Sequence, residues 1–372
     1  MNRAYKFRIY PTKEQEQLLA KTFGCCRFVY NTMLEEKIRE YQTTGKMKRT
    51  TPAMYKETYP WLKEVDSLAL ANVQLHLERA YKAFFRNPKI GFPRFKSRHG
   101  SRQSYTTNVV NGNVCLSEKC LKLPKLKEIK IRKHREIPGG YRLKSVTVSK
   151  ESTGKYYASL LYETAACESQ AGAEKKKAEN ILGIDYAMDG MAVFSDGRKC
   201  GYPPLFRMSA EKLAREQRRL SHCQKGSRNY QKQKRRVALC HEKVRNQRKD
   251  FQHKLSRKLA EGYDAVAVED LDMKAMSQCL KLGKGVMDNS YGMFRELLSY
   301  KLKERGKEMV KVDRYFPSSK KCSVCGHVKE ELSLSERIYD CGCGNVMDRD
   351  VNAAINIREE GRRLLEAAQC CA

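Results

Sequence analysis

The first part of the chain changes its hydrophobic pattern twice. Residues 4–11, AYKFRIYP, alternate apolar and polar side chains and end in proline, which predicts a strand. Apolar residues then recur at helical spacing over residues 13–42 and over about 66–87, which predicts two helices. Short alternating runs broken by Gly, Asn and Pro follow, from Gly91 to about residue 165. We therefore expect a small β-barrel built partly with the first strand, with the helices inserted into it.

The second part alternates predicted strands with predicted helices. The strands are ILGIDYA, MAVFSD, YDAVAVEDL and MVKVDRY, and the helices cover residues 208–260 as a pair, MFRELLSYKLKERG, and the end of the chain to about residue 367. Residues 166–179 are polar and rich in Ala, Gly, Glu and Lys, which predicts a linker. The whole pattern indicates an α+β, multidomain protein.

Charge narrows the class of partner. The chain carries 74 Lys and Arg against 43 Asp and Glu, a formal net charge of +31. A field of this sign attracts polyanions, above all nucleic acid. A basic soluble enzyme is the alternative, although solubility needs only about 2–8 net charges in a small domain. Residues 207–258 hold 18 Lys and Arg against 4 Asp and Glu, and predict a charged wall for a phosphate backbone rather than a merely solvated hairpin.

Two features of the sequence indicate a protein of a reducing compartment that is not inserted into a membrane. No stretch approaches the roughly 18–20 continuous apolar residues of a transmembrane helix. The first residues, MNRAYKFRIYP, have no apolar signal core. We therefore expect a cytoplasmic, nucleoid-associated protein whose scattered cysteines stay free thiols.

Four of the 15 cysteines are clustered, as Cys322-Ser-Val-Cys325 and Cys341-Gly-Cys343. Two thiolate pairs at this separation predict one zinc ion, which is structural because four protein ligands leave no open position for water. The second pair is one residue shorter than usual, and His327 is an alternative to one thiolate. Four free cysteines are the other interpretation.

Three acids have positions that suit chemistry. Asp185 lies in the strand ILGIDYA, Glu269 ends the strand DAVAVED, and Asp350 starts the last helix in MDRDVNAAINI. An acid at the carboxyl end of a strand faces the crevice where ligands bind in an open α/β sheet. Carboxylates that converge in a basic protein suit two Mg²⁺ ions and phosphodiester cleavage. Each acid alone also has a structural explanation, and Asp348 is placed to cap the last helix.

The order GID…VEDL…CxxCG…DRDVNAAINI resembles that of the TnpB family, the RuvC-like nucleases of insertion sequences that are related to type V CRISPR effectors. The resemblance covers roughly residues 3–360, and includes YKFRIYPTKEQEQLLAKTFGCCRFVYN, WLKEVDSLALAN, GFPRFKS and YFPSSKKCSVCG. Several unrelated motifs in one order are far more specific than any one motif. The chain departs from the family in the short C-x-C arm and in GIDYAMDG, which places an extra acid, Asp189, near Asp185.

The resemblance assigns roles and boundaries. It implies that Asp185, Glu269 and Asp350 are the catalytic acids that bind Mg²⁺, and that the four clustered cysteines bind zinc. The implied domains are a wedge-like β-barrel (1–10 and 91–165), a helical recognition insertion (11–90), the linker (166–179), an RNase H-like RuvC domain (180–316, with the basic pair 208–260), a zinc-binding insert (317–345) and the RuvC C-terminal helix (346–367).

The resemblance also implies nucleic-acid partners. These are a guide RNA transcribed from the element's own end and a double-stranded target DNA, in which base pairing supplies the specificity and the protein reads a short adjacent motif. Candidate contacts are Tyr55, Asn72, Tyr105 and Asn111 for the motif bases, and Arg235, Arg236, Arg245 and Arg248 in the basic helical pair. The sequence does not indicate an oligomeric state.

We therefore expect a Mg²⁺-dependent, RNA-guided DNA endonuclease, with residues 272–291 as a lid over its cleft. One alternative is a guide-directed repressor that no longer cuts, although all three acids are present. Another is a transposase that joins strands, since acidic triads also perform that reaction. A plain zinc-ribbon protein that binds nucleic acid explains the cysteines and the charge but not the three acids.

Overall fold

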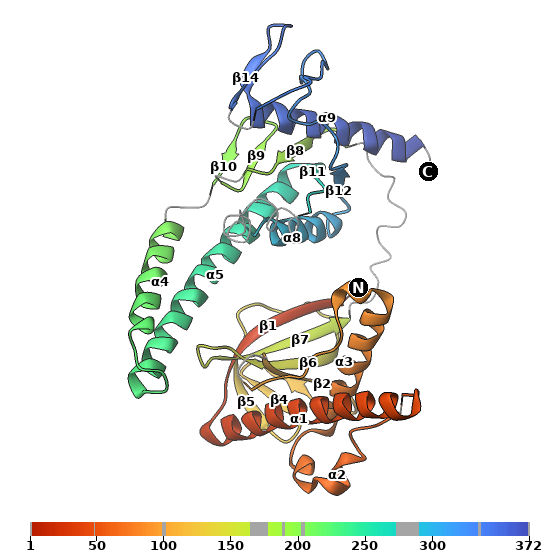
Figure 1. Cartoon of the computed structure of the whole chain (residues 1–372), viewed down its shortest axis with the longest axis vertical. Coiled ribbons are helices and arrows are strands. Elements are labelled where there is room, and N and C mark those ends of the chain that lie inside the picture. The colour runs from red at the N-terminus through yellow and green to blue at the C-terminus, as the bar shows by residue number, and fades with distance from the viewer. Residues whose placement is uncertain are drawn as a thin grey trace. The chain divides into compact units, whose positions relative to one another are not determined.

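The computed structural model describes residues 2–47, 49–98, 102–163, 178–187, 190–201, 205–272, 290–333 and 336–370. The chain divides into two compact units, Met1–Glu168 and Ser169–Ala372 (Figure 1). Asp189, most of the expected lid and the expected linker up to residue 177 lie outside the described residues. Within these ranges, no helix has both the length and the apolar character that crossing a membrane requires.

The first unit contains a seven-stranded antiparallel sheet in the order β2-β6-β7-β1-β5-β4-β3. The predicted first strand lies inside this sheet, between β7 and β5, and buries Tyr5, Phe7 and Ile9 on one face. The strands are β1 (Asn2–Tyr10), β2 (Gln103–Asn108), β3 (Cys115–Leu116), β4 (Cys120–Leu123), β5 (Lys127–Arg132), β6 (Arg142–Lys150) and β7 (Tyr156–Glu163). The hairpin predicted around Ser152 joins β6 to β7.

The expected barrel is not found as a closed structure. Among the described residues, β2 and β3 are the two edges of the sheet and do not pair with each other. β3 has only two residues, too few for the continuous ladder of hydrogen bonds that closure requires. The mixed α+β, multidomain class is therefore confirmed, whereas the sheet of the first unit is open.

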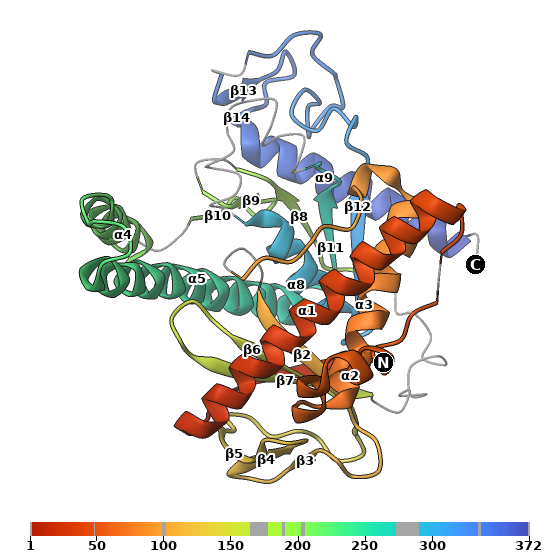
Figure 2. The ribbon, with the colours of Figure 1, turned by 60° about the horizontal axis from the view of Figure 1, so that its bottom comes forward.

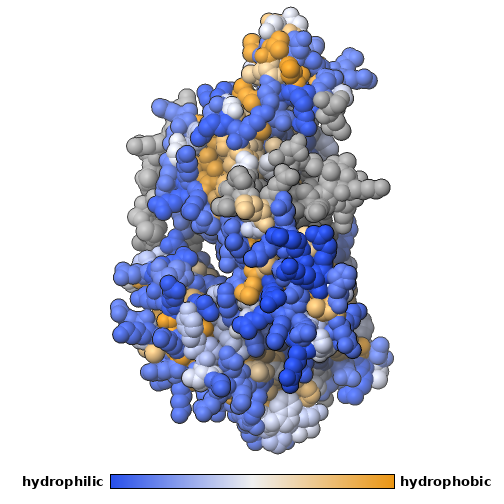
Figure 3. All heavy atoms as spheres, turned by 90° about the vertical axis from the view of Figure 1, so that its left-hand side faces the viewer, coloured by the Kyte–Doolittle hydropathy of each residue, from blue (hydrophilic) through white to orange (hydrophobic). Residues whose placement is uncertain are grey.

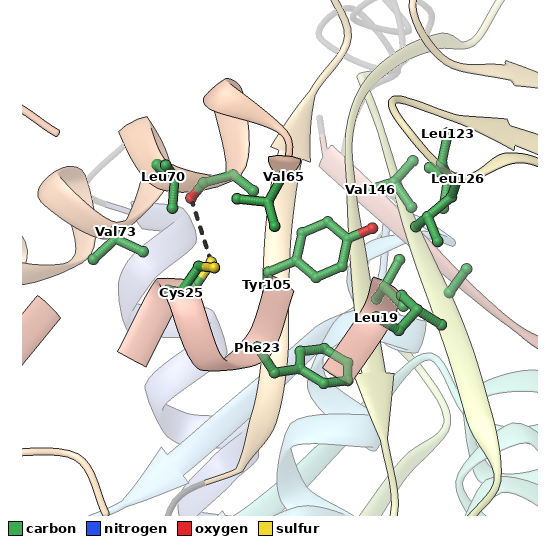
Figure 4. Packing of buried hydrophobic residues seen from close by; sticks show 14 of the residues in the cluster. Leu19, Phe23, Cys25, Val65, Leu70, Val73, Tyr105, Leu123, Leu126 and Val146 are labelled. Atoms are coloured by element: carbon green, nitrogen blue, oxygen red, sulfur yellow. Dashed lines mark hydrogen bonds between the residues drawn. The ribbon is translucent and has the colours of Figure 1, made fainter. Parts of the chain in front are cut away.

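The chain leaves this sheet after β1 and returns to it at β2. Between them lie α1 (Lys13–Thr44), α2 (Tyr55–Thr58), a 3₁₀ turn η1 (Pro60–Glu64), α3 (Ser67–Arg86) and a second turn η2 (Pro88–Ile90). Thr12 begins α1 with a capping box, because its hydroxyl accepts from the Gln15 N–H while the Gln15 side-chain oxygen accepts from the Thr12 N–H. Leu19 and Phe23 of α1 pack around Tyr105 of β2 (Figure 4).

The second unit is built on a five-stranded sheet in the order β10-β9-β8-β11-β12. Its strands are β8 (Ile181–Asp185), β9 (Ala192–Phe194), β10 (Lys199–Cys200), β11 (Ala265–Glu269) and β12 (Glu308–Val312). The three strands β8, β11 and β12 are parallel, and β9 pairs antiparallel with both β8 and β10. β8 and β11 are apolar and buried along their length except at their last residues, as expected for strands covered on both faces.

Helices cover both faces of this sheet. α5 (Arg228–Gly262) and α8 (Tyr291–Lys303) lie on one face, and α9 (Arg349–Cys370) lies on the other (Figure 1). Leu182 and Val266 pack with residues of α5 and α8, whereas Ile181 and Ala267 pack with residues of α9. α9 lies so close to β8 that a Cβ added at Gly183 would meet the Ala354 carbonyl oxygen at 2.0 Å. A larger residue at this position would therefore separate the helix from the sheet.

Two further pieces complete the second unit. α4 (Leu205–Ser221) packs beside α5 as an antiparallel helical hairpin, as predicted for residues 208–260 (Figure 2). Between β12 and α9 the chain forms a small two-stranded sheet from β13 (Ile338–Asp340) and β14 (Val346–Asp348). This segment carries the clustered cysteines and leads directly into α9.

Candidate functional site

Two of the three candidate acids end neighbouring strands. The parallel pairing of β8 with β11 places Ile184 opposite Val268, and the next residue in each strand is Asp185 and Glu269. The two carboxylates therefore extend from the same edge of the sheet. This is the carboxyl end of the parallel strands, where open α/β sheets hold their ligands.

The third acid reaches this edge through α9. Burial raises the pKa of Asp185 well above its usual range, and the negative charges of Glu269 and Asp350 raise it further. Charges act in this way only over short distances, so the structure brings together three acids that are far apart in the sequence. We call Asp185, Glu269 and Asp350 the carboxylate site.

The donor set of the carboxylate site fits Mg²⁺. It offers only oxygen atoms, which are the ligands that this hard cation prefers. Like charges that disfavour one another's ionisation are stabilised by a cation between them. The three acids are less compact than the cysteine cluster, which within the described residues is the only tight group of three or more metal-ligating side chains.

A serine that the sequence analysis did not single out holds Glu269. The Ser318 hydroxyl donates to Glu269 Oε1 over 2.6 Å. Burial raises the pKa of Glu269, and this hydrogen bond opposes the rise. The Ser318 carbonyl in turn accepts from Asn356 Nδ2 of α9 over 2.8 Å, so α9 fixes the loop that orients Glu269.

Asp348 sets the start of α9 and thereby the position of Asp350. Its Oδ1 accepts the N–H groups of Asp350 (3.1 Å) and Val351 (3.2 Å), so the predicted capping role is confirmed. Its other oxygen, Oδ2, pairs with Lys199 Nζ of β10 at 2.5 Å. Burial would raise the pKa of Asp348, but the hydrogen bond from Lys199 and the capped N–H groups hold it below its usual value.

The four cysteines converge as a second group. The Sγ atoms of Cys322, Cys325, Cys341 and Cys343 lie within 4.8 Å of one another. Cys322 Sγ is 3.7 Å from Cys343 Sγ, and Cys325 Sγ is 3.6 Å from Cys341 Sγ. These separations are too long for disulfides. They match the edge of about 3.8 Å that a tetrahedron of thiolates around zinc requires when each Zn–S bond is ~2.3 Å. The short C-x-C arm thus supplies both its ligands, and His327 is not needed.

The surroundings of Cys322 favour its thiolate form. Burial opposes ionisation of Cys322, but the N–H groups of Cys325 and Val324 and the Asn345 side chain lower the pKa of Cys322 to about 6. Gly344 turns the second arm in the left-handed region, at φ 88°, which an L side chain rarely adopts. The residues present therefore fit a structural zinc ion.

α9 links the cluster to the carboxylate site. The buried side chain of Asn352 accepts from the Ser323 N–H (2.9 Å) and donates to the Lys321 carbonyl (2.7 Å). Asn356, one turn further, also donates to the Lys321 carbonyl, over 2.6 Å. The first cysteine arm is therefore anchored to the helix that carries Asp350.

A detectable signal for these two asparagines existed in the sequence. In MDRDVNAAINI they lie four residues apart, on the face of α9 that is otherwise apolar and buried. Buried polar side chains need hydrogen-bond partners, so the position of the two asparagines predicts hydrogen bonds to a neighbouring segment. Ser318 had no comparable signal, because one serine in YFPSSKK resembles another until the chain is folded.

The basic candidates lie on the α4–α5 hairpin. Arg235, Arg236 and Arg245 are exposed, and Arg248 is half-buried and donates to the Ser290 hydroxyl. Inside the hairpin, Gln233 of α5 donates to the Glu216 carboxylate of α4 over 2.6 Å. The hairpin therefore satisfies an acid internally and presents its excess of positive charge outward.

The candidates for motif reading are mostly buried. Tyr55, Asn72 and Tyr105 are 6%, 6% and 4% exposed. The Tyr55 hydroxyl donates to Glu36, Asn72 donates to the Leu68 carbonyl of its own helix, and Tyr105 lies in the core. Only Asn111 is exposed among these four residues. Burial leaves little of the first three side chains exposed, although Asn72 and Tyr105 line a cavity of the first unit.

Three family profiles match the chain. Residues 159–280 match the IS605 OrfB profile described as “Probable transposase”, and residues 291–357 match “Cas12f1-like, TNB domain”. Residues 1–46 match an IS605 OrfB profile described as “Helix-turn-helix domain”. Over residues 2–46, however, the structure has one strand and one long helix, and not two helices joined by a turn.

Whole-chain relatives agree with these profiles. A “Putative RNA-guided DNA endonuclease” of Streptomyces pristinaespiralis is 36% identical, over 100% of this chain and 91% of the relative. “Putative RNA-guided DNA endonuclease InsQ” of Escherichia coli K12 is 31% identical, over 98% of this chain and 94% of the relative. The solved “Cas12f1-sgRNA-target DNA complex” shares the fold at a TM-score of 0.59 and 16% identity, over 96% of this chain and 98% of that chain. The chain therefore belongs to the TnpB family, the OrfB proteins of IS605-type elements.

Proposed function

We propose that this protein is an RNA-guided DNA endonuclease that cleaves phosphodiester bonds at the carboxylate site. The observation that carries the proposal is the convergence of Asp185, Glu269 and Asp350 at one edge of a sheet in a chain of net charge +31. A repressor without nuclease activity would have no use for two further acids close enough to raise the pKa of Asp185. Membership of a family whose relatives bear the name RNA-guided DNA endonuclease supports the same conclusion.

The three acids would hold two Mg²⁺ ions. Bound there, the ions supply an activated water and charge stabilisation for the leaving oxygen. The protein's own part is orientation: Ser318 fixes one Glu269 oxygen, and Asp348 fixes the first turn of α9 and so the Asp350 carboxylate. The cysteine cluster would hold one structural zinc ion and fix the entry of the chain into α9.

The proposed partners are a guide RNA from the element's own end and a double-stranded target DNA beside a short motif. Exposed Arg235, Arg236 and Arg245 on the α4–α5 hairpin suit a phosphate backbone, because their contacts need no base sequence. Base pairing with the guide would supply sequence specificity. The solved relative of the same fold is described as a complex with sgRNA and target DNA.

We also propose the domain assignment given by the sequence. Residues 1–10 and 91–165 would form the wedge lobe, 11–90 the recognition insertion and 180–316 the RuvC-like domain, with the zinc insert and the final helix after it. The strand order β10-β9-β8-β11-β12, with β9 antiparallel to three parallel strands, supports an RNase H-like arrangement of the nuclease lobe.

One experiment tests the proposal directly. The protein is co-expressed with RNA transcribed across the end of its element, the RNA that co-purifies is sequenced, and the complex is given a plasmid with the matching target beside randomised flanks. We expect Mg²⁺-dependent linear DNA from the wild type. Asp185→Ala should retain RNA and DNA binding and produce no linear DNA, whereas Glu366→Ala, an exposed acid of α9, should cut normally.

The other outcomes separate the alternatives. Target occupancy without breaks by the wild type would indicate a repressor, and joined strands would indicate a transposase. RNA-free wild-type protein that binds no DNA would overturn the proposal. Loss of binding in Asp185→Ala would contradict the role assigned to the carboxylate site.

A further inference from the structure

Four aromatic rings form a connected group in the first unit, outside the sites described above. Tyr81, Phe84 and Phe85 come from the end of α3, and Phe92 follows η2. The ring centroids of Phe92 lie 5.6 Å from Tyr81 and 5.4 Å from Phe84. Those of Phe85 lie 6.2 Å from Tyr81 and 5.5 Å from Phe84. We call these four residues the aromatic shelf.

The shelf is anchored on one side and open on the other. Tyr81 is buried, at 5% exposure, and belongs to the core of the first unit. Phe85 is 64% exposed and Phe92 is 45% exposed, and the neighbouring Ile90 is 59% exposed. Most of the surface in the face drawn in Figure 3 is hydrophilic, with hydrophobic side chains in small groups. Exposed apolar side chains that gather around a buried ring in this way indicate a binding surface.

The charges around the shelf identify the kind of partner. Residues 79–98 contain seven Lys and Arg and no Asp or Glu. Lys82, Arg86, Lys89, Arg94 and Arg98 are exposed, and none of them forms an ion pair with a carboxylate of the described residues. An uncompensated positive rim around apolar rings suits a ligand with both a flat apolar face and a negative backbone. Unpaired nucleic acid has both.

We propose that the aromatic shelf binds unpaired bases of the guide RNA, an inference that rests on the proposed function. Phenylalanine rings have no hydrogen-bonding group, so they stack on bases without reading their sequence. Bases within a duplex have their faces covered by neighbours, so only unpaired ones can lie on Phe85 and Phe92. We expect RNA rather than DNA on the shelf. An exposed apolar surface is unfavourable in water, and a guide RNA would cover it also in the periods when no target DNA is bound.

The test compares substitutions that separate stacking from charge and from apolar area. Phe85→Ala/Phe92→Ala removes the exposed rings, Phe85→Leu/Phe92→Leu keeps apolar area without rings, and Phe85→Tyr/Phe92→Tyr keeps the rings. Lys82→Ala/Arg86→Ala removes two charges of the rim. Dissociation constants are measured without Mg²⁺, over a range of salt, for the RNA that co-purifies and for an (rA)₁₂ oligonucleotide in single-stranded form or paired with (rU)₁₂.

We expect the Ala and Leu pairs to bind the co-purified RNA and single-stranded (rA)₁₂ more weakly, by about 5- to 150-fold per base that loses its ring. The Tyr pair should bind normally, and the (rA)₁₂·(rU)₁₂ duplex should be insensitive to all three. The Ala pair should keep the slope of log K against log salt, whereas the charge pair should flatten it by about 1.4 for the single-stranded RNA. Matching circular dichroism and melting temperatures verify that these exposed substitutions leave the fold intact.

Three results would overturn the proposal. The first is unchanged RNA affinity of the Ala pair, and the second is full affinity of the Leu pair, which would indicate an apolar protein contact. The third comes from a photo-crosslinking experiment with p-benzoylphenylalanine at position 85. This residue should cross-link to the guide RNA before DNA is added. Cross-links that form only with added DNA would contradict RNA as the occupant. Because affinity is measured without cleavage, failure here leaves the nuclease proposal standing, and a wild type that binds no RNA would defeat the nuclease proposal instead.

Discussion

The cysteine cluster and the carboxylate site depend on the same helix but are assembled differently. All four thiols come from the single segment between Cys322 and Cys343, in two arms of two cysteines. The three carboxylates come from β8, β11 and α9, which are separated by long stretches of chain. Short chelating loops are set by local geometry, whereas the carboxylates meet only after strand pairing and helix docking. Spacing alone therefore predicts the first site far better than the second.

The two groups also differ in their effect on stability. The thiols lie at the separations that a zinc ion requires, so zinc binding stabilises the folded cysteine cluster, and folding of the cluster favours zinc binding. Burial and the charges of Glu269 and Asp350 disfavour the charged form of Asp185, and burial disfavours that of Glu269. Substitution in the first group should therefore destabilise the protein, and substitution in the second should remove function without loss of stability.

The largest effect on cleavage should separate the two aspartates of MDRDVNAAINI. Asp350→Asn should lower the single-turnover cleavage rate by more than about 1,000-fold, beyond the 10–100-fold typical of residues that only support a metal ligand. Its melting temperature in Mg²⁺-free buffer should be unchanged or higher. Asp348→Asn is the matched control, since asparagine also caps helices, and it should lose only the exposed ion pair with Lys199. Equal cleavage by the two variants would contradict the roles assigned here.

Loss of one thiol of the cysteine cluster should lower the stability of the protein, in contrast to the loss of a carboxylate. Cys322→Ser should reduce the zinc content from about one ion per chain to none, because three ligands hold this ion poorly. Inductively coupled plasma mass spectrometry measures this content. The melting temperature should fall, and proteolysis should cut within residues 316–347. The exposed Cys115 provides the control, as Cys115→Ser should keep zinc and stability. A zinc-free variant of unchanged stability would show that the cluster is not structural.

An intermediate effect is expected where the two groups meet. Ser318→Ala removes the hydrogen bond to Glu269 and should lower cleavage by about 10–100-fold, with a higher Mg²⁺ concentration for half-maximal rate. Zinc content should not change. Ser319→Ala, one residue further, should behave as the wild type. A rate loss that excess Mg²⁺ does not reduce would argue against a role in metal binding.

The smallest effect on cleavage is expected for Lys301, which joins α8 to α5 behind the sheet. Its Nζ donates to the His253 carbonyl (2.6 Å) and the Ser256 hydroxyl (2.7 Å). Burial, then Arg305 and Arg257, lowers the pKa of Lys301 to about 8, against the opposite effect of Glu304 and Glu261.

The sign of the pH dependence follows from that shift. Between about pH 8 and 10.5 the unfolded chain binds this proton and the folded chain does not, so the unfolding free energy should rise with pH over this window. Urea titrations at several pH values should lose that component in Lys301→Met and keep it in Lys303→Met, which changes an exposed lysine of the same helix. An identical pH profile in both variants would refute the assignment.

Regular elements were predictable because their signals are local. The alternation in AYKFRIYP predicted β1, and the apolar spacing over residues 13–42 predicted α1. The proline-free basic stretch predicted the α4–α5 hairpin. Barrel closure was not predictable in this way, since it depends on whether the short edge strands β2 and β3 can reach each other.

Buried polar residues explain the weakest of the sequence predictions. Asn72 and Tyr105 were expected at a surface because they are polar, yet both lie in the core of the first unit or at its edge. Asn72 satisfies its side chain within its own helix, and Tyr105 shares the inward face of β2 with Thr107. Polarity alone does not decide exposure when a side chain can find its hydrogen bond locally.

The sequence by itself determined the net charge and the kinds of donor atom from which we propose the partners and the metals. The charge of +31, the two cysteine arms and the acids at the ends of apolar segments are properties of residues and short spacings. Only the tertiary structure decided that Ser318 hydrogen-bonds Glu269 and that Asn352 and Asn356 connect the segment of the cysteine cluster to α9. It also decided that glycine at position 183 lets α9 approach β8. These contacts join residues far apart in the chain, so no local pattern encodes them; strand register and close packing do.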